Sequence, residues 1–170
     1  MGVRAASAGT QANELCQVTD QPIDLGALVS RALPDDQGAQ VVFSGVVRNI
    51  NLGRQVVAVE YEAFAPMAEN VFREFAAEAR QKFGPTTAVT IVHRVGRLHV
   101  GESSVAIIVT TRHRDECYRA SRYVIEELKK RAPVWKKEFY TDGETEWVQG
   151  HALCGHHHNT HQEHDHSAPS

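Results

Sequence analysis

Basic side chains at the ends of predicted strands and helices are the residues of this 170-residue sequence that could carry chemistry. Arg48 follows a predicted buried strand, and His113 and Arg114 lie where another strand gives way to a helix. Such a strand-to-helix junction exposes free backbone N–H groups, which favour an anion. His113 and Arg114, which lie beside this junction, are therefore candidates for binding a compact anion.

Two lysines flank a turn that Pro133 fixes. Lys129 lies in the last turn of the predicted helix, and Lys136 follows seven residues later. Both amines could converge on one pocket, where a desolvated lysine can serve as a base or a nucleophile. A lysine at the end of a helix also compensates the helix dipole without any catalytic role. The spacing alone leaves both interpretations open.

The formal net charge of −3 conceals a basic segment. Residues 1–150 sum to −1, whereas residues 112–137 hold nine Lys and Arg against four Asp and Glu. This local excess on a near-neutral chain favours a small anionic ligand over a long nucleic-acid track. A solvated helix face is one alternative. The other is an RNA- or nucleotide-binding module, for which Tyr118, Tyr123 and Trp135 supply only weak aromatic interleaving.

The composition, 42% hydrophobic and 23% charged, predicts a single folded domain. No apolar run reaches the ~18 residues of a membrane span, and the first residues lack the apolar stretch of a secretory signal. We therefore expect a cytoplasmic protein with no membrane partner. The three cysteines are widely spaced, and no common nucleotide-binding, zinc-protease or serine-hydrolase motif occurs. We expect no metal site within the domain.

Hydrophobic periodicity predicts an α+β fold with a mixed sheet and two main helices, at residues 66–83 and 115–131. A short helix capped by Asp24 precedes them. Strands are predicted at 39–47, 55–62, 88–95, 104–111 and 134–140, and a further one around Trp147. We expect the first two strands to pair as a hairpin across the polar loop RNINLGR.

Three segments differ in composition along the chain. Residues 1–20 are small and polar and are predicted to be flexible, residues 21–150 form the domain, and residues 151–170 hold seven of the ten histidines. This His-rich tail is predicted to be disordered because it has almost no apolar residues. His-rich tracts bind Zn, Ni or Cu ions, so a metal-binding or metal-delivery protein is an alternative function, and an inert tail is the other interpretation.

Five segments, taken in order, carry a family resemblance. They are FSGVVRNINLG at 43–53, VEYEAFAPMAE at 59–69, IVHRVGRLHVGE at 91–102, TTRHR at 110–114 and ELKKRAPVWKKE at 127–138. Over roughly residues 20–150 the sequence resembles the large, catalytic subunit of molybdopterin synthase. The resemblance implies an α/β-hammerhead-like fold, a central homodimer and a sulfurtransferase of molybdenum cofactor synthesis, and we expect no resident cofactor. A small ubiquitin-like subunit would deliver sulfur, as a thiocarboxylate on its Gly-Gly tail, to cyclic pyranopterin monophosphate.

The resemblance also implies the pocket residues. It makes Lys129 the acid–base group and Lys136 the side chain that orients the thiocarboxylate or the intermediate. The sequence departs from the family after Trp147, where QGHALCGHHH replaces charged residues and leaves His151 as a candidate stand-in. The implied substrate-binding residues are Val46, Val47, Arg48, His113, Arg114, Lys129, Lys136, Lys137 and Glu138.

Overall fold

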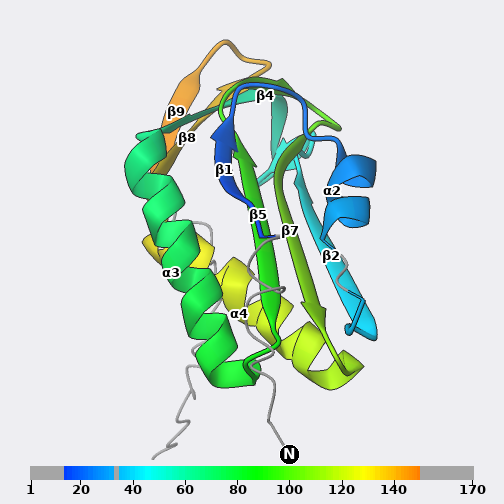
Figure 1. The fold of residues 1–170 in the computed structure, drawn as a ribbon. Coiled ribbons are helices and arrows are strands. Elements are labelled where there is room, and N and C mark those ends of the chain that lie inside the picture. Colours follow the sequence, from blue (N-terminus) through cyan, green and yellow to red (C-terminus); the bar gives the residue numbers. More distant parts are fainter. Residues whose placement is uncertain (1–13, 33–34, 150–170) are drawn as a thin grey trace, which may run out of the picture.

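The computed structural model describes residues 14–32 and 35–149. They fold into three helices and nine strands in an α+β arrangement (Figure 1). The expectations for the His-rich tail, His151 and the first thirteen residues lie outside the described residues. Within the described ranges, no helix is both long and apolar enough to cross a membrane.

A mixed four-stranded sheet forms the centre of the fold, in the order β1-β5-β7-β2. β1 is parallel to β5, and the other two pairs are antiparallel. The central strands are almost entirely buried, which explains why both read as continuous apolar runs rather than as alternating patterns. The strands are β1 (Cys16–Thr19), β5 (Ala88–Arg94), β7 (Ser103–Thr111) and β2 (Ala39–Val46).

The two main helices, α3 (Ala65–Phe83) and α4 (Arg114–Arg131), pack against this sheet and against each other (Figure 1). Their apolar stripes contribute Phe72, Phe75 and Val124 to the main core, and all three are fully buried. The short helix α2 (Leu25–Arg31) begins as predicted, because Asp24 Oδ1 accepts a hydrogen bond from the Ala27 N–H at 3.0 Å. The predictions of a mixed sheet and two main helices are confirmed.

A second, antiparallel sheet lies beyond one end of the first (Figure 1). Its strand order is β3-β4-β8-β9, and β6 also pairs with β4. A smaller core of Val47, Val56, Val59, Leu98 and Tyr140 lies under this sheet. The strands are β3 (Ile50–Asn51), β4 (Arg54–Ala63), β6 (Gly96–His99), β8 (Val134–Tyr140) and β9 (Thr145–Gln149).

The expected hairpin between strands 39–47 and 55–62 is wrong. β2 pairs with β7, whereas β4 pairs with β3, β6 and β8 in the other sheet. The actual hairpin is β3–β4, closed by Leu52 and Gly53 at φ values of 49° and 78°. Two central residues with positive φ form the tight turn that suits a two-residue hairpin. The chain therefore crosses from one sheet to the other at Val47 and Arg48 instead of turning back on β2.

The boundary expected at residue 20 also needs correction. Cys16–Thr19 form the edge strand β1, and the Val18 N–H donates to Glu69 Oε1 on α3 at 3.1 Å. Four residues are too few to show a hydrophobic period, so the sequence pattern did not predict this strand. The same reason applies to β6, which lies in what was expected to be the connection between two neighbouring strands.

Candidate active site

A cavity of about 520 Å³ lies between the two sheets, beside the C-terminal end of α4. β2, β4, β5, β7, β8 and α4 all contribute side chains to it, so segments from residue 43 to residue 138 converge here. Its wall is mixed, with apolar residues on the side of the sheets and amines, carboxylate, amide and guanidinium groups around them. A concave site with a few convergent polar groups is the usual form of a small-molecule site.

The last residues of β2 reach the cavity because of a bulge. Gly45 is opposite Val105 and Val46 is opposite Ser103, so Ser104 is the extra residue on β7. A Cβ on Gly45 would lie 2.7 Å from Val105 Cγ1, so glycine permits this close approach. Beyond the bulge, the Val47 N–H donates to the Glu102 carbonyl at 3.0 Å. This places Val46 and Val47 in the cavity wall and the exposed Arg48 at its mouth.

The last two turns of α4 supply another wall. Ile125, Leu128 and Lys129 face the cavity from neighbouring positions on the helix. The helix ends at Arg131, since Ala132 is extended and Pro133 follows it. The chain then enters β8 at Val134, which brings Lys136 to the same cavity. The prediction that Lys129 and Lys136 converge across the proline turn is confirmed.

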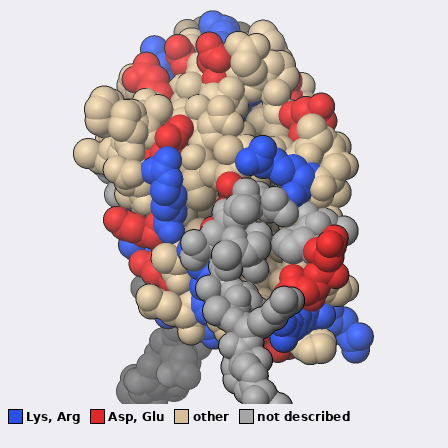
Figure 2. Space-filling view, viewed as in Figure 1, with Lys and Arg blue, Asp and Glu red and all other residues tan. Residues whose placement is uncertain are grey.

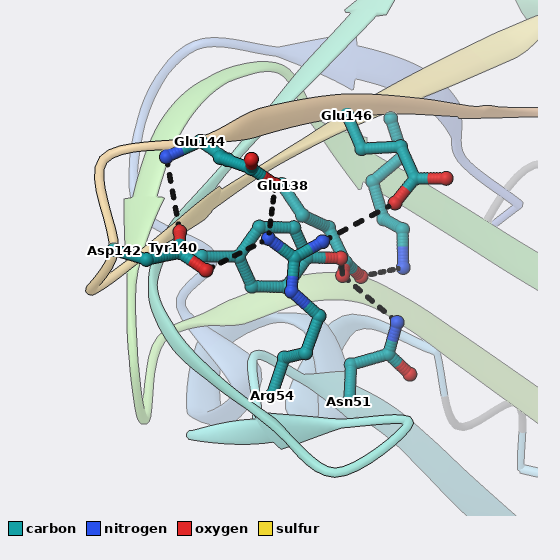
Figure 3. A network of polar contacts seen from close by, with 8 residues as sticks. Asn51, Arg54, Glu138, Tyr140, Asp142, Glu144 and Glu146 are labelled. Carbon is teal, nitrogen blue, oxygen red and sulfur yellow. Dashed lines mark hydrogen bonds and ion pairs between the residues drawn. The ribbon is translucent and has the colours of Figure 1, made fainter.

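Lys136 is fixed by a buried carboxylate. Its Nζ lies 2.5 Å from Glu138 Oε1, and the Glu138 side chain is 3% exposed. The other carboxylate oxygen, Oε2, accepts hydrogen bonds from Asn51 Nδ2 at 2.8 Å and from the Tyr140 hydroxyl at 2.7 Å. Figure 3 shows Asn51 and Tyr140 directed at Glu138 from different strands. Both oxygens of this buried carboxylate are therefore satisfied.

The hydrogen bonds decide the charge state of this carboxyl. Burial acts to raise the pKa of Glu138, but the donors Lys136, Tyr140 and Asn51 outweigh it, and the pKa is lowered. The hydrogen bond to Glu138, together with burial, raises the pKa of the Tyr140 hydroxyl. The cavity wall therefore holds an ionised carboxylate beside a lysine amine, and the neutral phenol of Tyr140 donates to this carboxylate.

A neutral histidine borders the cavity on the side of β5. His93 is 4% exposed, and its ring meets Tyr61 edge-on with centroids 5.2 Å apart. Burial lowers the pKa of His93 to about 4, against the weaker opposing effect of a backbone hydrogen bond to Arg94. Nδ1 lies 3.0 Å from the Arg94 carbonyl oxygen, which can only accept, so Nδ1 carries the proton. Burial also raises the pKa of the Tyr61 hydroxyl.

Six of the predicted site residues meet in this cavity, and three do not. His113 and Arg114 line a second cavity of about 550 Å³ at the other end of α4. His113 is sixteen residues before Lys129, about 24 Å along the helix axis, so one small substrate cannot touch both in one chain. The Lys137 amine instead lies 5.4 Å from the Phe139 ring centroid and 5.6 Å from that of Trp147. The residues brought together are Val46, Val47, Arg48, Lys129, Lys136 and Glu138.

Ion pairs neutralise most of the basic segment. Six of its nine cations pair with a carboxylate, while among the described residues no ion pair involves Arg114, Lys129 or Lys137. On the face drawn in Figure 2, blue and red side chains are interspersed rather than gathered in a basic track. This distribution does not favour a long nucleic acid. The paired cations are Arg112, Arg119, Arg122, Lys130, Arg131 and Lys136.

Five polar residues of the cavity were not singled out from the sequence. The residues that line it without having been predicted are Ser44, Asn51, Tyr61, His93 and Ser104. Ser44 and Asn51 lie in the segment FSGVVRNINLG, so the first motif segment contained both. Tyr61 lies in VEYEAFAPMAE and His93 in IVHRVGRLHVGE. Ser104 lies outside the motif segments, within a predicted strand, where the pattern gives no sign of a cavity on one side.

The fold and the site together define a class of protein. It is an α+β domain whose cavity, between two sheets, holds two lysines and a buried carboxylate. This chain belongs to the MoaE protein family, whose model matches residues 18–131. It is 45% identical over 133 residues to the molybdopterin synthase catalytic subunit of Synechococcus elongatus, covering 78% of this chain and 81% of that protein.

Two solved structures show the same fold. The crystal structure of molybdopterin synthase from Staphylococcus aureus matches with a TM-score of 0.74 and 37% identity, covering 78% of this chain and 95% of that one. A chain from the complex of subunits 1 and 2 of the molybdopterin-converting factor of Helicobacter pylori matches with a TM-score of 0.65, covering 78% of this chain and 89% of that one. Its identity is 19%, so it supports the fold alone.

Proposed function

We propose that this chain is the catalytic subunit of a molybdopterin synthase. It transfers sulfur from the thiocarboxylated C-terminus of a small ubiquitin-like subunit to cyclic pyranopterin monophosphate, forming the dithiolene of molybdopterin. The observation that carries the proposal is the cavity where Lys129 and Lys136 converge from α4 and β8. The 45% identity to a protein named as the catalytic subunit of this enzyme supports it.

The charges around the cavity suit this substrate. A cyclic phosphate is a compact anion, and Arg48 at the mouth can hold it through charge-assisted hydrogen bonds. Val46 and Val47 give an apolar wall on which the flat pterin ring can pack. Lys136, ion-paired with Glu138, presents a fixed positive charge that can orient the thiocarboxylate or the singly sulfurated intermediate.

Lys129 is the proposed acid–base group. Each sulfur addition needs a proton removed and an oxygen lost as water, so a positioned proton carrier is required. Lys129 is half-buried between Ile125 and Leu128, and its stem can run along their apolar surface while the amine enters the cavity. Among the described residues no ion pair involves it, in contrast to Lys136. This difference supports proton transfer by Lys129 and orientation by Lys136.

His113 and Arg114 stay in the proposal as anion-binding residues of the second cavity. They can act on the same substrate only where another copy of the chain brings them near, and the proposed homodimer provides such a copy. The α/β-hammerhead arrangement and a cytoplasmic location are part of the same proposal. Light scattering of the purified chain tests the dimer directly, since a monomeric mass would remove this role.

The proposed activity is tested by reconstitution. The purified chain is incubated with a thiocarboxylated small subunit and cyclic pyranopterin monophosphate, and molybdopterin is measured. We expect product in proportion to the thiocarboxylate supplied, and none with the same small subunit bearing an ordinary carboxylate. Absence of product with a small subunit that is active with another synthase would contradict the proposed function.

A further inference from the structure

We propose that Asn51 and Tyr140 are positioning residues of the reaction, because they fix the Glu138 carboxylate that holds Lys136 at the cavity wall. The proposal rests on the proposed function for the reaction itself. The arrangement of the residues is independent of it and can be tested without turnover.

The two oxygens of Glu138 have separate tasks. Oε1 contacts the Lys136 amine at 2.5 Å, while Oε2 accepts from Asn51 at 2.8 Å and from Tyr140 at 2.7 Å. Two donors from different strands on one oxygen define the plane of the carboxylate, and hence the direction of Oε1. The Glu138 side chain is 3% exposed, so water cannot readily replace a donor that is lost.

The groups that hold Glu138 are themselves held by one turn. Asn51 is opposite Arg54 in the β3–β4 hairpin. Asn51 points to Glu138, while the Arg54 guanidinium lies over the Tyr140 ring, 3.6 Å from its centroid (Figure 3). Arg54 is in turn bound by Asp142 at 3.0 Å and by Glu144 at 2.9 Å. Asn51 and Arg54 flank the Leu52-Gly53 turn, and Asn51 contacts the cavity wall while Arg54 binds the exposed carboxylates of the β8–β9 hairpin.

A fixed Lys136 has a chemical reason. A lysine amine is a point charge on a flexible four-carbon stem, so it aims at one atom only when other groups restrict it. A misplacement of about 1 Å in an active site can cost as much as ~100-fold in rate. Asn51 and Tyr140 bond to Oε2, whereas the Lys136 amine bonds to Oε1, so their effect on the amine passes through Glu138.

Tyr140→Phe removes one donor to Oε2 and leaves the ring under Arg54. The matched control is Tyr123→Phe. The Tyr123 hydroxyl donates to Glu78 Oε2 at 2.5 Å, so this variant also removes a hydrogen bond from a phenol to a carboxylate, but one that lies outside the cavity. For Tyr140→Phe we expect kcat to fall about tenfold and KM for the pterin to change less than about twofold. The acid limb of the pH–rate profile should shift to higher pH by about one unit, because Glu138 loses a hydrogen-bond donor that lowers its pKa.

Asn51→Ala should behave like Tyr140→Phe, and the double variant should lose less than the product of the two effects, because both donors serve one oxygen. If Tyr140→Phe matches Tyr123→Phe in kcat and in pH profile, the positioning role is refuted. An inactive wild-type chain would count against the proposed function instead. NMR titration of the Glu138 carboxyl carbon needs no turnover: a higher pKa in Tyr140→Phe supports the proposal, and an unchanged pKa overturns it.

Discussion

The buried histidine beside the cavity should make the protein less stable in mild acid. The pKa of His93 is lowered from 6.5 to about 4 in the folded chain, chiefly because burial disfavours the imidazolium. Below pH 6.5 the unfolded chain therefore binds a proton that the folded chain excludes. The contribution to stability is complete above this pH and is lost as the pH falls from 6.5 towards 4.

The size of the effect follows from the two pKa values. One pKa unit corresponds to about 1.4 kcal/mol, so the full shift corresponds to about 3 kcal/mol. Between pH 6.5 and 4.5, a single group with these pKa values removes about 2 kcal/mol from the free energy of unfolding. The carboxyls with lowered pKa values, such as Glu138, lose their contribution mainly below this window, because the ordinary value is 4.5.

The measurement is urea unfolding at a series of pH values for wild type and His93→Asn. The asparagine amide can replace Nδ1–H as donor to the Arg94 carbonyl, but it does not titrate. The variant is expected to be less stable at pH 7.5, since it loses the ring contact with Tyr61. The difference between the two proteins should shrink by about 2 kcal/mol from pH 6.5 to 4.5. A difference that stays constant across this window would refute the argument that His93 is buried as a neutral ring.

Two further predictions concern stability. Leu52 has a φ of 49° and is 93% exposed, so it bears the strain of the left-handed region without any packing gain. Leu52→Asn should raise the free energy of unfolding by about 1 kcal/mol, and Leu52→Val should lower it; the reverse order in urea unfolding would contradict the strained turn. Phe72 is fully buried in the main core, so Phe72→Ala should cost about 3–5 kcal/mol. Met67→Ala, on the same helix but 53% exposed, should cost under about 1 kcal/mol, and equal losses would contradict the packing of α3.

The hydrophobic pattern predicted the long elements, because each main helix buries one face and the two central strands are buried on both faces. α3 and α4 were evident from their apolar stripes, and β5 and β7 from their continuous apolar runs. Strand pairing was not evident from the sequence, because it depends on packing between apolar faces that lie far apart along the chain. β2 was expected beside β4, yet it lies against β7, which is more than fifty residues further along the sequence. Short strands such as β1 and β6 give too few positions to show a period.

The candidate site was predictable where the local chain sets the geometry. Pro133 reverses the chain between Lys129 and Lys136, so their convergence follows from a few neighbouring residues. His113 was grouped with them by motif, but the length of α4 separates it from Lys129. The role of Tyr140 was hidden because a tyrosine at the end of a strand is usually a core residue. Only the pairing of β3, β4 and β8 places it beside Glu138.

Lys129 is the proposed proton carrier of sulfur transfer, and Lys130 beside it on the same helix offers the control. Lys129 is half-buried in the cavity wall, whereas Lys130 is exposed and paired with Glu127 at 3.6 Å. A lysine that only compensates the helix dipole contributes at most ~1 kcal/mol of stability. A general acid–base group contributes roughly 10²–10⁴ in rate.

The decisive measurement is the rate of molybdopterin formation by Lys129→Ala and Lys130→Ala in the reconstituted reaction. Lys129→Ala should lose at least about a hundredfold in rate, with melting temperature and binding of the small subunit nearly unchanged. Lys129→Arg should not restore the rate, because a guanidinium stays protonated. Lys130→Ala should match wild type. Equal rates for Lys129→Ala and Lys130→Ala would contradict proton transfer by Lys129 and leave it as a helix-end lysine without a catalytic role.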